Sequence, residues 1–457
     1  MKVIEAKEIG LIMSRMLLNR PNNMLLDWHL LLDDTSKNRL IKDAALNEKA
    51  LVVGRVGLIL LSCGTGAWRV REAMNSIATN LGIICVADVG FTSINLSCFD
   101  SARESYSQTY VLSGTGVNTD KLSTIDKFVK NFGQQLETLT VAGVHDQLET
   151  INKKTANYNP VINGLAAALA CSCFIFLLGG GIPEMIGSFI GAGVGNLVKS
   201  LMTRKHYSTL ISLGIAVAVA GLAYVGTFHL MRIFIDLPLS HESGYIGAML
   251  FVIPGFPFIT SMLDISKLDM RSGIERLSYA TMITVVSALV GWVIAASAKF
   301  YPADFVVLPL TTNQIIILQL IASFGGVFGF SVMFNSPINI AITASLIGAV
   351  ANTTRLSLIS LYHVQPSWAA FIGALIAGVL ASIVNHYKGY PRITLTVPAI
   401  VIMVPGLYIY KAIYYIGFNQ LATGLLWLNK AILIILFLPL GLFVARSLLD
   451  YKWQHFN

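Results

Sequence analysis

The sequence predicts a polytopic α-helical membrane protein: about ten transmembrane helices in an inverted five-plus-five repeat, with an N-terminal soluble α/β domain. Three observations support this fold class. The 457 residues are 55% hydrophobic and only 12% charged, whereas soluble chains are about a quarter charged. From about Pro160 onward, uncharged stretches long enough to span a bilayer follow one another. A Pro-Gly step recurs inside two of them.

The first part of the chain is the more polar one. Residues 1–48 are helix-prone and charged, and we expect a polar helical arm there. Residues 49–157 combine helical and alternating patterns, which predicts a cytoplasmic α/β domain. The expected helices are 48–61, 67–81, 120–134 and 141–153, and the expected strands are 83–88, 92–99 and 109–113.

The rest of the chain is almost wholly apolar. We expect a first five-helix membrane module at 158–305 and a second at 306–457. The uncharged stretch 305–354 is too long for one helix, and Asn335-Ser336-Pro337 is the natural break in it. The expected spans are 161–180, 183–200, 208–229, 244–264, 277–298, 313–334, 337–354, 367–386, 394–414 and 430–448.

The positive charges predict an orientation. With the α/β domain in the cytoplasm, more lysines and arginines fall in inside loops than in outside loops, as the positive-inside rule requires. Both termini are then cytoplasmic, and the net charge of +8 reflects topology rather than nucleic-acid binding. The inside loops contain Lys199, Arg204, Lys205, Lys267, Arg271, Arg276, Lys388 and Arg392, and the outside loops contain Arg232, Lys299, Arg355 and Lys430.

Two Pro-Gly steps organise the membrane part. Pro254-Gly255 and Pro405-Gly406 each interrupt an apolar span, because proline lacks a backbone donor and clashes with the preceding turn. In lipid, a broken backbone persists only where protein or a watery cavity satisfies the freed polar groups. Interrupted helices in matching positions of two halves are typical of secondary transporters.

The two halves share features in the same order. The second span of each half contains an asparagine motif, the third a Gly-to-His interval and the fourth the Pro-Gly step. Because each half has five spans, the second half would be inverted in the membrane. The first two matches are Gly193-Val194-Gly195-Asn196 with Ala349-Val350-Ala351-Asn352, and Gly221 and His229 with Gly378 and His386.

Polar residues inside spans are costly, so they are candidates for function. Free backbone groups at the two breaks suit a carboxylate. No Walker lysine motif is present, so an ion or substrate gradient would supply the energy. We expect no cofactor and no metal. The predicted substrate-binding residues are Asn196, Pro254, Gly255, Asn352, Pro405 and Gly406, and the predicted proton-coupling residues are Glu184, Asp264, His229 and Lys411.

Two alternatives stay open. A passive channel for small acids would use the same breaks without coupling. A membrane-anchored hydrolase would have its site in the α/β domain, where Cys63 and His145 are the imaginable nucleophile and base. No oxyanion glycine motif accompanies these two residues in the sequence.

The chain resembles the threonine/serine exporter family. The residues that carry the resemblance, over about 51–449, are Gly66-Ala67-Trp68-Arg69-Val70-Arg71-Glu72, Val117-Asn118-Thr119-Asp120-Lys121-Leu122, Ile253-Pro254-Gly255-Phe256-Pro257 with Ser261-Met262-Leu263-Asp264-Ile265, and Val404-Pro405-Gly406. The second half is similar to a shorter partner module that is a separate chain in some members.

The resemblance implies export of small amino acids such as threonine and serine, coupled to the proton gradient. Since some two-chain relatives are linked to dicarboxylates such as succinate, an exporter or channel for these is the alternative. The expected partners are a small amino acid or carboxylate substrate and the lipid bilayer of the cell inner membrane. A homo-oligomer is compatible with the sequence, and a nucleic acid is not expected.

Overall fold

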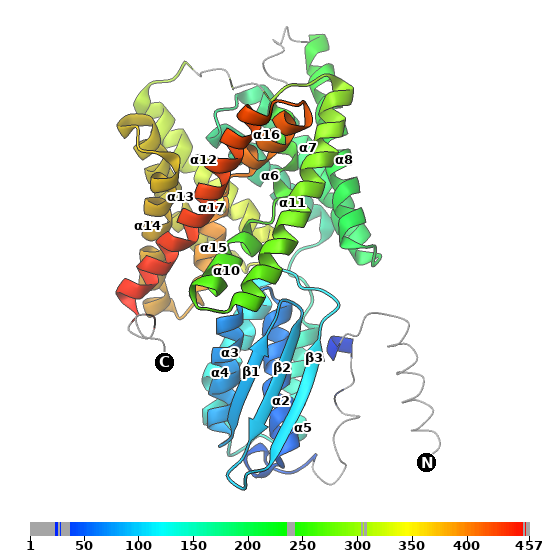
Figure 1. Ribbon diagram of the computed structural model, residues 1–457, viewed down its shortest axis with the longest axis vertical. Helices are drawn as coiled ribbons and strands as arrows, with labels where there is room; N and C mark the ends of the chain where they lie inside the picture. Colours follow the sequence, from blue (N-terminus) through cyan, green and yellow to red (C-terminus); the bar gives the residue numbers. More distant parts are fainter. Residues whose placement is uncertain are drawn as a thin grey trace. The chain divides into compact units, whose positions relative to one another are not determined.

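The computed structural model describes residues 23–25, 28, 37–234, 243–302, 305, 309–450 and 453. Most of the expected arm at 1–48 therefore lies outside the described residues. The chain divides into two compact units (Figure 1). The first, here called the α/β unit, comprises Met1–Thr155 with Lys267–Glu275, and the second, the membrane unit, comprises Ala156–Ser266 with Arg276–Asn457.

The α/β unit contains one antiparallel sheet with the strand order β1-β2-β3. Its helices lie on one face of the sheet, and α2 and α3 contact the strands (Figure 1). Alternate residues of β2 are buried against them: Ile94, Leu96 and Cys98. The elements are α2 (Leu46–Ser62), α3 (Ala67–Asn80), β1 (Ile84–Val89), β2 (Ser93–Phe99), β3 (Ser105–Val111), α4 (Thr119–Gln135) and α5 (Val141–Lys153).

Strand β3 begins four residues before the position expected from the sequence. Ser105 pairs with Phe99, and Val111 pairs with Ser93, so β3 matches the full length of β2. The residues of this added part are polar and alternate in burial, as in a sheet with one solvated face. The sequence pattern undervalues such strands because their outer face carries no apolar signal.

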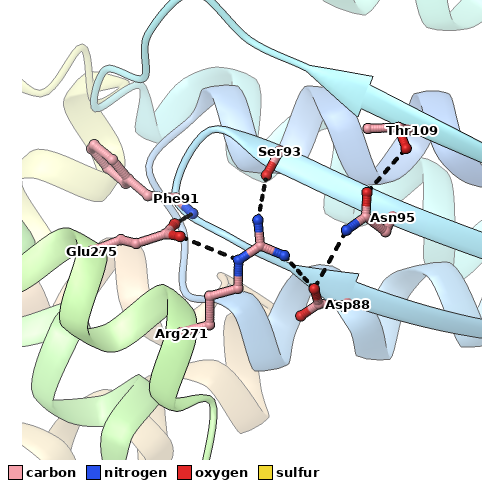
Figure 2. Close-up of polar contacts among 7 residues, drawn as sticks. All are labelled: Asp88, Phe91, Ser93, Asn95, Thr109, Arg271 and Glu275. Atoms are coloured by element: carbon pink, nitrogen blue, oxygen red, sulfur yellow. Dashed lines mark hydrogen bonds and ion pairs between the residues drawn. The ribbon is translucent and has the colours of Figure 1, made fainter.

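A short segment that runs from the residue after Ser266 into the beginning of the helix Met270–Ala298 belongs to the α/β unit. Within Lys267–Glu275, Arg271 forms an ion pair with Asp88 and donates to Ser93 Oγ at 3.2 Å (Figure 2). The Phe91 backbone N–H donates to Glu275 Oε2 at 2.6 Å. These contacts join the segment to the turn between β1 and β2. We call the segment 267–275 the clasp.

The membrane unit is helical. Within the described residues, eight helices are long and apolar enough to cross a membrane, and two bent pairs raise the number to ten if each pair is one span. The single helices are α6 (Pro160–Leu177), α7 (Ile182–Arg204), α8 (Thr209–Phe234), α11 (Met270–Ala298), α12 (Thr312–Met333), α13 (Ile338–Tyr362), α14 (Pro366–Lys388) and α17 (Leu421–Leu449).

Both Pro-Gly steps break their helices, as the sequence predicts. One pair is α9 (Tyr245–Met249), continued by η5 (Leu250–Val252), with α10 (Gly255–Ser266), and it bends by 51°. The other pair is α15 (Arg392–Val401) with α16 (Gly406–Gly417), and it bends by 46°. The long uncharged stretch is also divided where expected, with Asn335 at φ +59° between α12 and α13.

Several charged residues expected in loops lie on helices instead. These residues are Lys199 and Arg204 in α7, Arg232 in α8, Arg271 and Arg276 in α11, Arg355 in α13, Lys388 in α14, Arg392 at the start of the helix Arg392–Val401, and Lys430 in α17. The sequence prediction ended spans near charges, but helices continue past the hydrocarbon core, and long cationic side chains can reach the interface from within a helix. The placement of these residues in loops was therefore wrong.

Candidate functional site

The two helix breaks lie against each other inside the membrane unit. A Cβ atom added to Gly255 would lie 2.5 Å from Val401 Cγ2, and one added to Gly406 would lie 2.2 Å from Ile253 Cδ1. Each break is thus packed on the residues just before the other. The cavity beside Ile253 and Gly406 has a volume of only about 20 Å³, which is room for about one water molecule. The structure brings Pro254-Gly255 and Pro405-Gly406 together, and the cavity beside Ile253 and Gly406 is too small for an amino acid or a dicarboxylate.

The two predicted asparagines join neighbouring helices. Asn196 Nδ2 donates to the Asn163 carbonyl of α6 at 2.8 Å, and Asn352 Nδ2 donates to Ser323 Oγ of α12 at 2.9 Å. Both asparagines are buried, and neither lines the larger cavity described next. Among the described residues, Asn352 Oδ1 has no hydrogen-bond partner.

Lys411, a predicted site residue, lines a cavity of substrate size. The cavity has a volume of about 530 Å³, within the range of small-molecule sites. It lies at one end of the helix bundle, because its walls come from the end of α6, the beginnings of α12 and α14, the end of α13, and from α16 and α17. Its lining residues are Phe176, Leu177, Leu178, Gly179, Phe305, Leu310, Ile315, Gln319, Arg355, Leu356, Ile359, Pro366, Leu407, Tyr408, Lys411 and Trp427.

Two buried cations face this cavity. Lys411 is 3% exposed, and its Nζ lies 4.6 Å from the centroid of the Trp427 ring. Arg355 is 9% exposed, and within the described part of the chain its Nε atom has no hydrogen-bond partner. The Gln319 Oε1 atom is likewise buried without one. The cavity wall therefore offers positive charge and one amide acceptor.

The described lining contains no aspartate or glutamate. Buried cations are costly unless an anion compensates them. A guanidinium binds a carboxylate through two parallel hydrogen bonds, and an ammonium attracts a second negative group as a point charge. The arrangement around Arg355 and Lys411 is thus chemically suited to a small solute that carries carboxylate groups.

Glu184, a predicted proton-coupling residue, is fully buried at the beginning of α7. Its Oε2 atom accepts a hydrogen bond from the Gly181 backbone N–H at 2.9 Å. Gly179, two residues earlier, lines the cavity. The carboxylate of Glu184 thus holds the loop that forms part of the cavity wall.

The other two predicted proton-coupling residues lie away from the cavity lining. Asp264 is fully buried, and its Oδ2 atom forms an ion pair with Arg276 Nε at 3.2 Å. His229 is exposed, its Nδ1 donates to the Val225 carbonyl at 2.9 Å, and its ring stacks on Phe300 at 6.3 Å.

The α/β unit does not bring Cys63 and His145 into a catalytic pair. His145 Nδ1 contacts Arg55 at 3.0 Å, and Arg55 precedes Cys63 by about two turns of α2. Burial raises the pKa of Cys63 to about 12, so its thiol keeps its proton at neutral pH and is a poor nucleophile.

Sequence reasoning missed Arg355, Gln319 and Tyr408. A signal for Arg355 was present: it follows Asn352 by three residues in an apolar helix, as Lys199 follows Asn196. Gln319 is a lone amide in an otherwise uncharged span, which could have marked it as costly. Tyr408 carries no such signal.

Eight to ten candidate membrane spans among the described residues, two broken helices and a buried cationic cavity are features of a polytopic membrane transport protein. The comparisons with known families agree. A family described as "Putative threonine/serine exporter" matches residues 51–298, and a second, described as "Threonine/Serine exporter, ThrE", matches residues 319–448. The chain belongs to the threonine/serine exporter family, as the sequence motifs predict, and it joins both modules of that family.

Three relatives show how far the similarity extends. The "Probable succinate transporter subunit YjjP" of Escherichia coli is 24% identical over 249 residues, which is 52% of this chain and 91% of the relative. The protein of the same name from Klebsiella aerogenes is 28% identical over 28% of this chain and 50% of the relative. The "Pheromone-regulated membrane protein 10" of Pichia sorbitophila is 23% identical over 69% of this chain, which spans only 32% of that relative. No solved structure is significantly similar to the chain.

Proposed function

We propose that this family member is a secondary active exporter whose substrate binds through its carboxylate groups between Arg355 and Lys411. The observation that supports this is the cavity of about 530 Å³ with two buried cations and no acid among its described lining residues. Leu407 lines the cavity and directly follows Gly406 of the second break. Passage to the other end of the bundle therefore requires the two breaks to move apart.

A dicarboxylate such as succinate is the substrate class that the cavity favours. One carboxylate of such a solute would pair with Arg355, whose Nε has no hydrogen-bond partner within the described residues, and the second would lie near the ammonium of Lys411. An ammonium group would be repelled by both cations. The name of the Escherichia coli relative points in the same direction.

Threonine and serine form the second candidate class. Their carboxylate suits Arg355, and the buried Gln319 Oε1 and the Tyr408 hydroxyl could accept hydrogen bonds from an ammonium group. The description of the family supports this class. A dicarboxylate exporter should take up succinate faster than threonine or serine, and an amino-acid exporter should do the reverse. Uptake measurements therefore separate the two classes.

An inverted repeat of the two five-helix modules is part of the proposal. Helix α7 contacts α6, α8 and α9, and α13 contacts α12, α14 and α15. The hydrogen bonds of Asn196 to α6 and of Asn352 to α12 occupy corresponding places in this pattern.

Close helix crossings add support for the repeat. A Cβ on Gly191 of α7 would lie 2.8 Å from Ala248 Cβ, and a Cβ on Gly348 of α13 would lie 2.9 Å from the Ala399 carbonyl oxygen. Ala248 and Ala399 each precede the proline of their break by six residues. Small residues at such crossings let helix backbones approach closely.

The proposed setting is the cell inner membrane with both termini in the cytoplasm, which follows from the distribution of positive charges. In this orientation the cavity opens towards the outer face. The proton gradient drives export, and Glu184 is the candidate for coupling. Protonation would remove the charge that holds the Gly181 N–H, and the cavity wall at Gly179 would loosen.

Uptake into proteoliposomes tests the function. Labelled succinate, threonine and serine are offered with and without an imposed proton gradient. We expect gradient-driven accumulation of succinate, with Glu184→Gln abolishing the dependence on the gradient. Accumulation of threonine or serine alone would favour the second class, flux that only equilibrates would indicate a channel, and no flux of any would refute the proposal.

A further inference from the structure

Lys199 repeats the position of Arg355 in the other half of the membrane unit. It follows Asn196 by three residues in α7, as Arg355 follows Asn352 in α13. Lys199 is half-buried, and its Nζ lies 5.9 Å from the centroid of the Phe251 ring. No salt bridge joins it to a carboxylate among the described residues.

The two cations lie near opposite faces of the membrane. Counting each bent pair as one span, the chain crosses five more times from α7 to the end of α13, so the two helices run in opposite directions. Each cation lies within about two turns of the C-terminal end of its helix. The face near Lys199 is the cytoplasmic one in the proposed orientation.

Two lysines of the membrane unit lie against aromatic rings. The ammonium of Lys411 rests on Trp427 of the open cavity, and the ammonium of Lys199 rests on Phe251 of the first broken span. An aromatic face attracts a cation weakly enough for an anionic ligand to replace it. Lys199 can therefore leave the Phe251 ring for an anionic ligand without breaking a salt bridge to another described residue.

We propose that Lys199 is the cation that binds the substrate carboxylate when the exporter is open to the opposite face. In an inverted repeat, alternating access exchanges the conformations of the two halves. Helix α7 then takes the setting that α13 has here, and Lys199 faces a cavity equivalent to the one that Arg355 lines. This inference rests on the proposed function and adds a second carboxylate-binding position to it.

The test separates the two faces of the membrane. In proteoliposomes of known orientation, the KM for labelled succinate is measured for transport in each direction. We expect Lys199→Met to raise the KM about tenfold or more for succinate offered on the Lys199 side and to leave the other KM within about twofold. Arg355→Met should do the reverse. Lys199→Arg should keep both values near those of the wild type, and Lys205→Met, at an exposed residue just after α7, serves as the matched control.

A second measurement needs no variant. A membrane-impermeant acylating reagent is applied to the wild-type protein on the Lys199 side, and modification of each lysine is followed by mass spectrometry. Succinate should slow the modification of Lys199 about fivefold or more and leave Lys205 unchanged.

The outcomes distinguish failure of this inference from failure of the proposed function on which it rests. Unchanged KM values in Lys199→Met, or an equal rise on both sides, together with unprotected Lys199 would overturn the inference. If Arg355→Met also leaves both KM values unchanged while the wild type transports succinate, the proposed site itself is wrong.

Discussion

Arg55 in the α/β unit and Arg355 in the membrane unit are both buried arginines on long helices, but their surroundings differ. Arg55 donates to the His145 carbonyl at 3.0 Å and forms an ion pair with Glu149. Arg355 lines a cavity, and its Nε has no partner within the described residues. A cation that stabilises a fold is buried with its carboxylate, whereas a cation that awaits a ligand is buried without one. The comparison predicts that replacing a cation lowers the free energy of unfolding more when its partner carboxylate is more deeply buried.

The largest loss of stability is expected for Arg276→Met, which leaves the fully buried Asp264 without this cation. Breaking a buried pair typically costs about 3–5 kcal/mol. Unfolding of the detergent-solubilised protein measures the loss. Asp264→Leu combined with Arg276→Met should recover most of it, and a loss as large in the double variant would contradict the explanation.

Arg55→Met should cost about 2 kcal/mol of unfolding free energy. Without Arg55, the Glu149 side chain, which is 26% exposed, can be hydrated. The fully buried His145 loses the guanidinium as its hydrogen-bond donor. Denaturant unfolding of the detergent-solubilised full chain gives the value. Arg55→Lys is the control, and we expect it to retain part of the stability. A loss of unfolding free energy equal to that of Arg276→Met would contradict the expected dependence on carboxylate burial.

A smaller loss, below about 1 kcal/mol, is expected for Arg271→Ala in the clasp. Its partners Asp88 and Glu275 are 57% and 41% exposed, so water and salt already screen them. The same unfolding measurement at low and high salt should show the difference shrinking as salt rises. A loss that does not depend on salt would mean that packing, not charge, holds the clasp.

Arg355→Met should leave the unfolding free energy within about 0.5 kcal/mol of the wild type, because no carboxylate of the described residues pairs with Arg355. Its effect should appear in transport, where loss of a charge-assisted contact lowers kcat/KM for succinate about 10- to 100-fold. A destabilisation of several kcal/mol would show that Arg355 is structural and would remove the distinction from Arg55.

Local chemistry made much of the membrane fold predictable. A proline that cannot donate and cannot fit the preceding turn breaks a helix wherever it folds, so the bends at Pro254 and Pro405 follow from the sequence. The family also follows from motifs such as Ile253-Pro254-Gly255-Phe256-Pro257. The span limits were less certain, since α17 begins at Leu421 and includes Lys430.

The candidate site was less accessible to sequence reasoning. Whether Lys411 lies against Trp427 depends on how α16 and α17 pack, and residues from six helices line the cavity. The pairing of Asp264 with Arg276 likewise joins residues that looked like a coupling group and a loop charge. Tertiary packing decides these roles, and a one-dimensional pattern does not contain it.

The clasp also constrains the order in which the protein is made. The ribosome synthesises residues 1–155 first. The last segment of the α/β unit, 267–275, is synthesised only after the intervening apolar helices α6 to α10. Until then the turn between β1 and β2 lacks Arg271 and Glu275. Completion of the first unit therefore has to wait for insertion of those helices, and a fragment that stops at Thr155 represents an unfinished stage of synthesis rather than the mature unit.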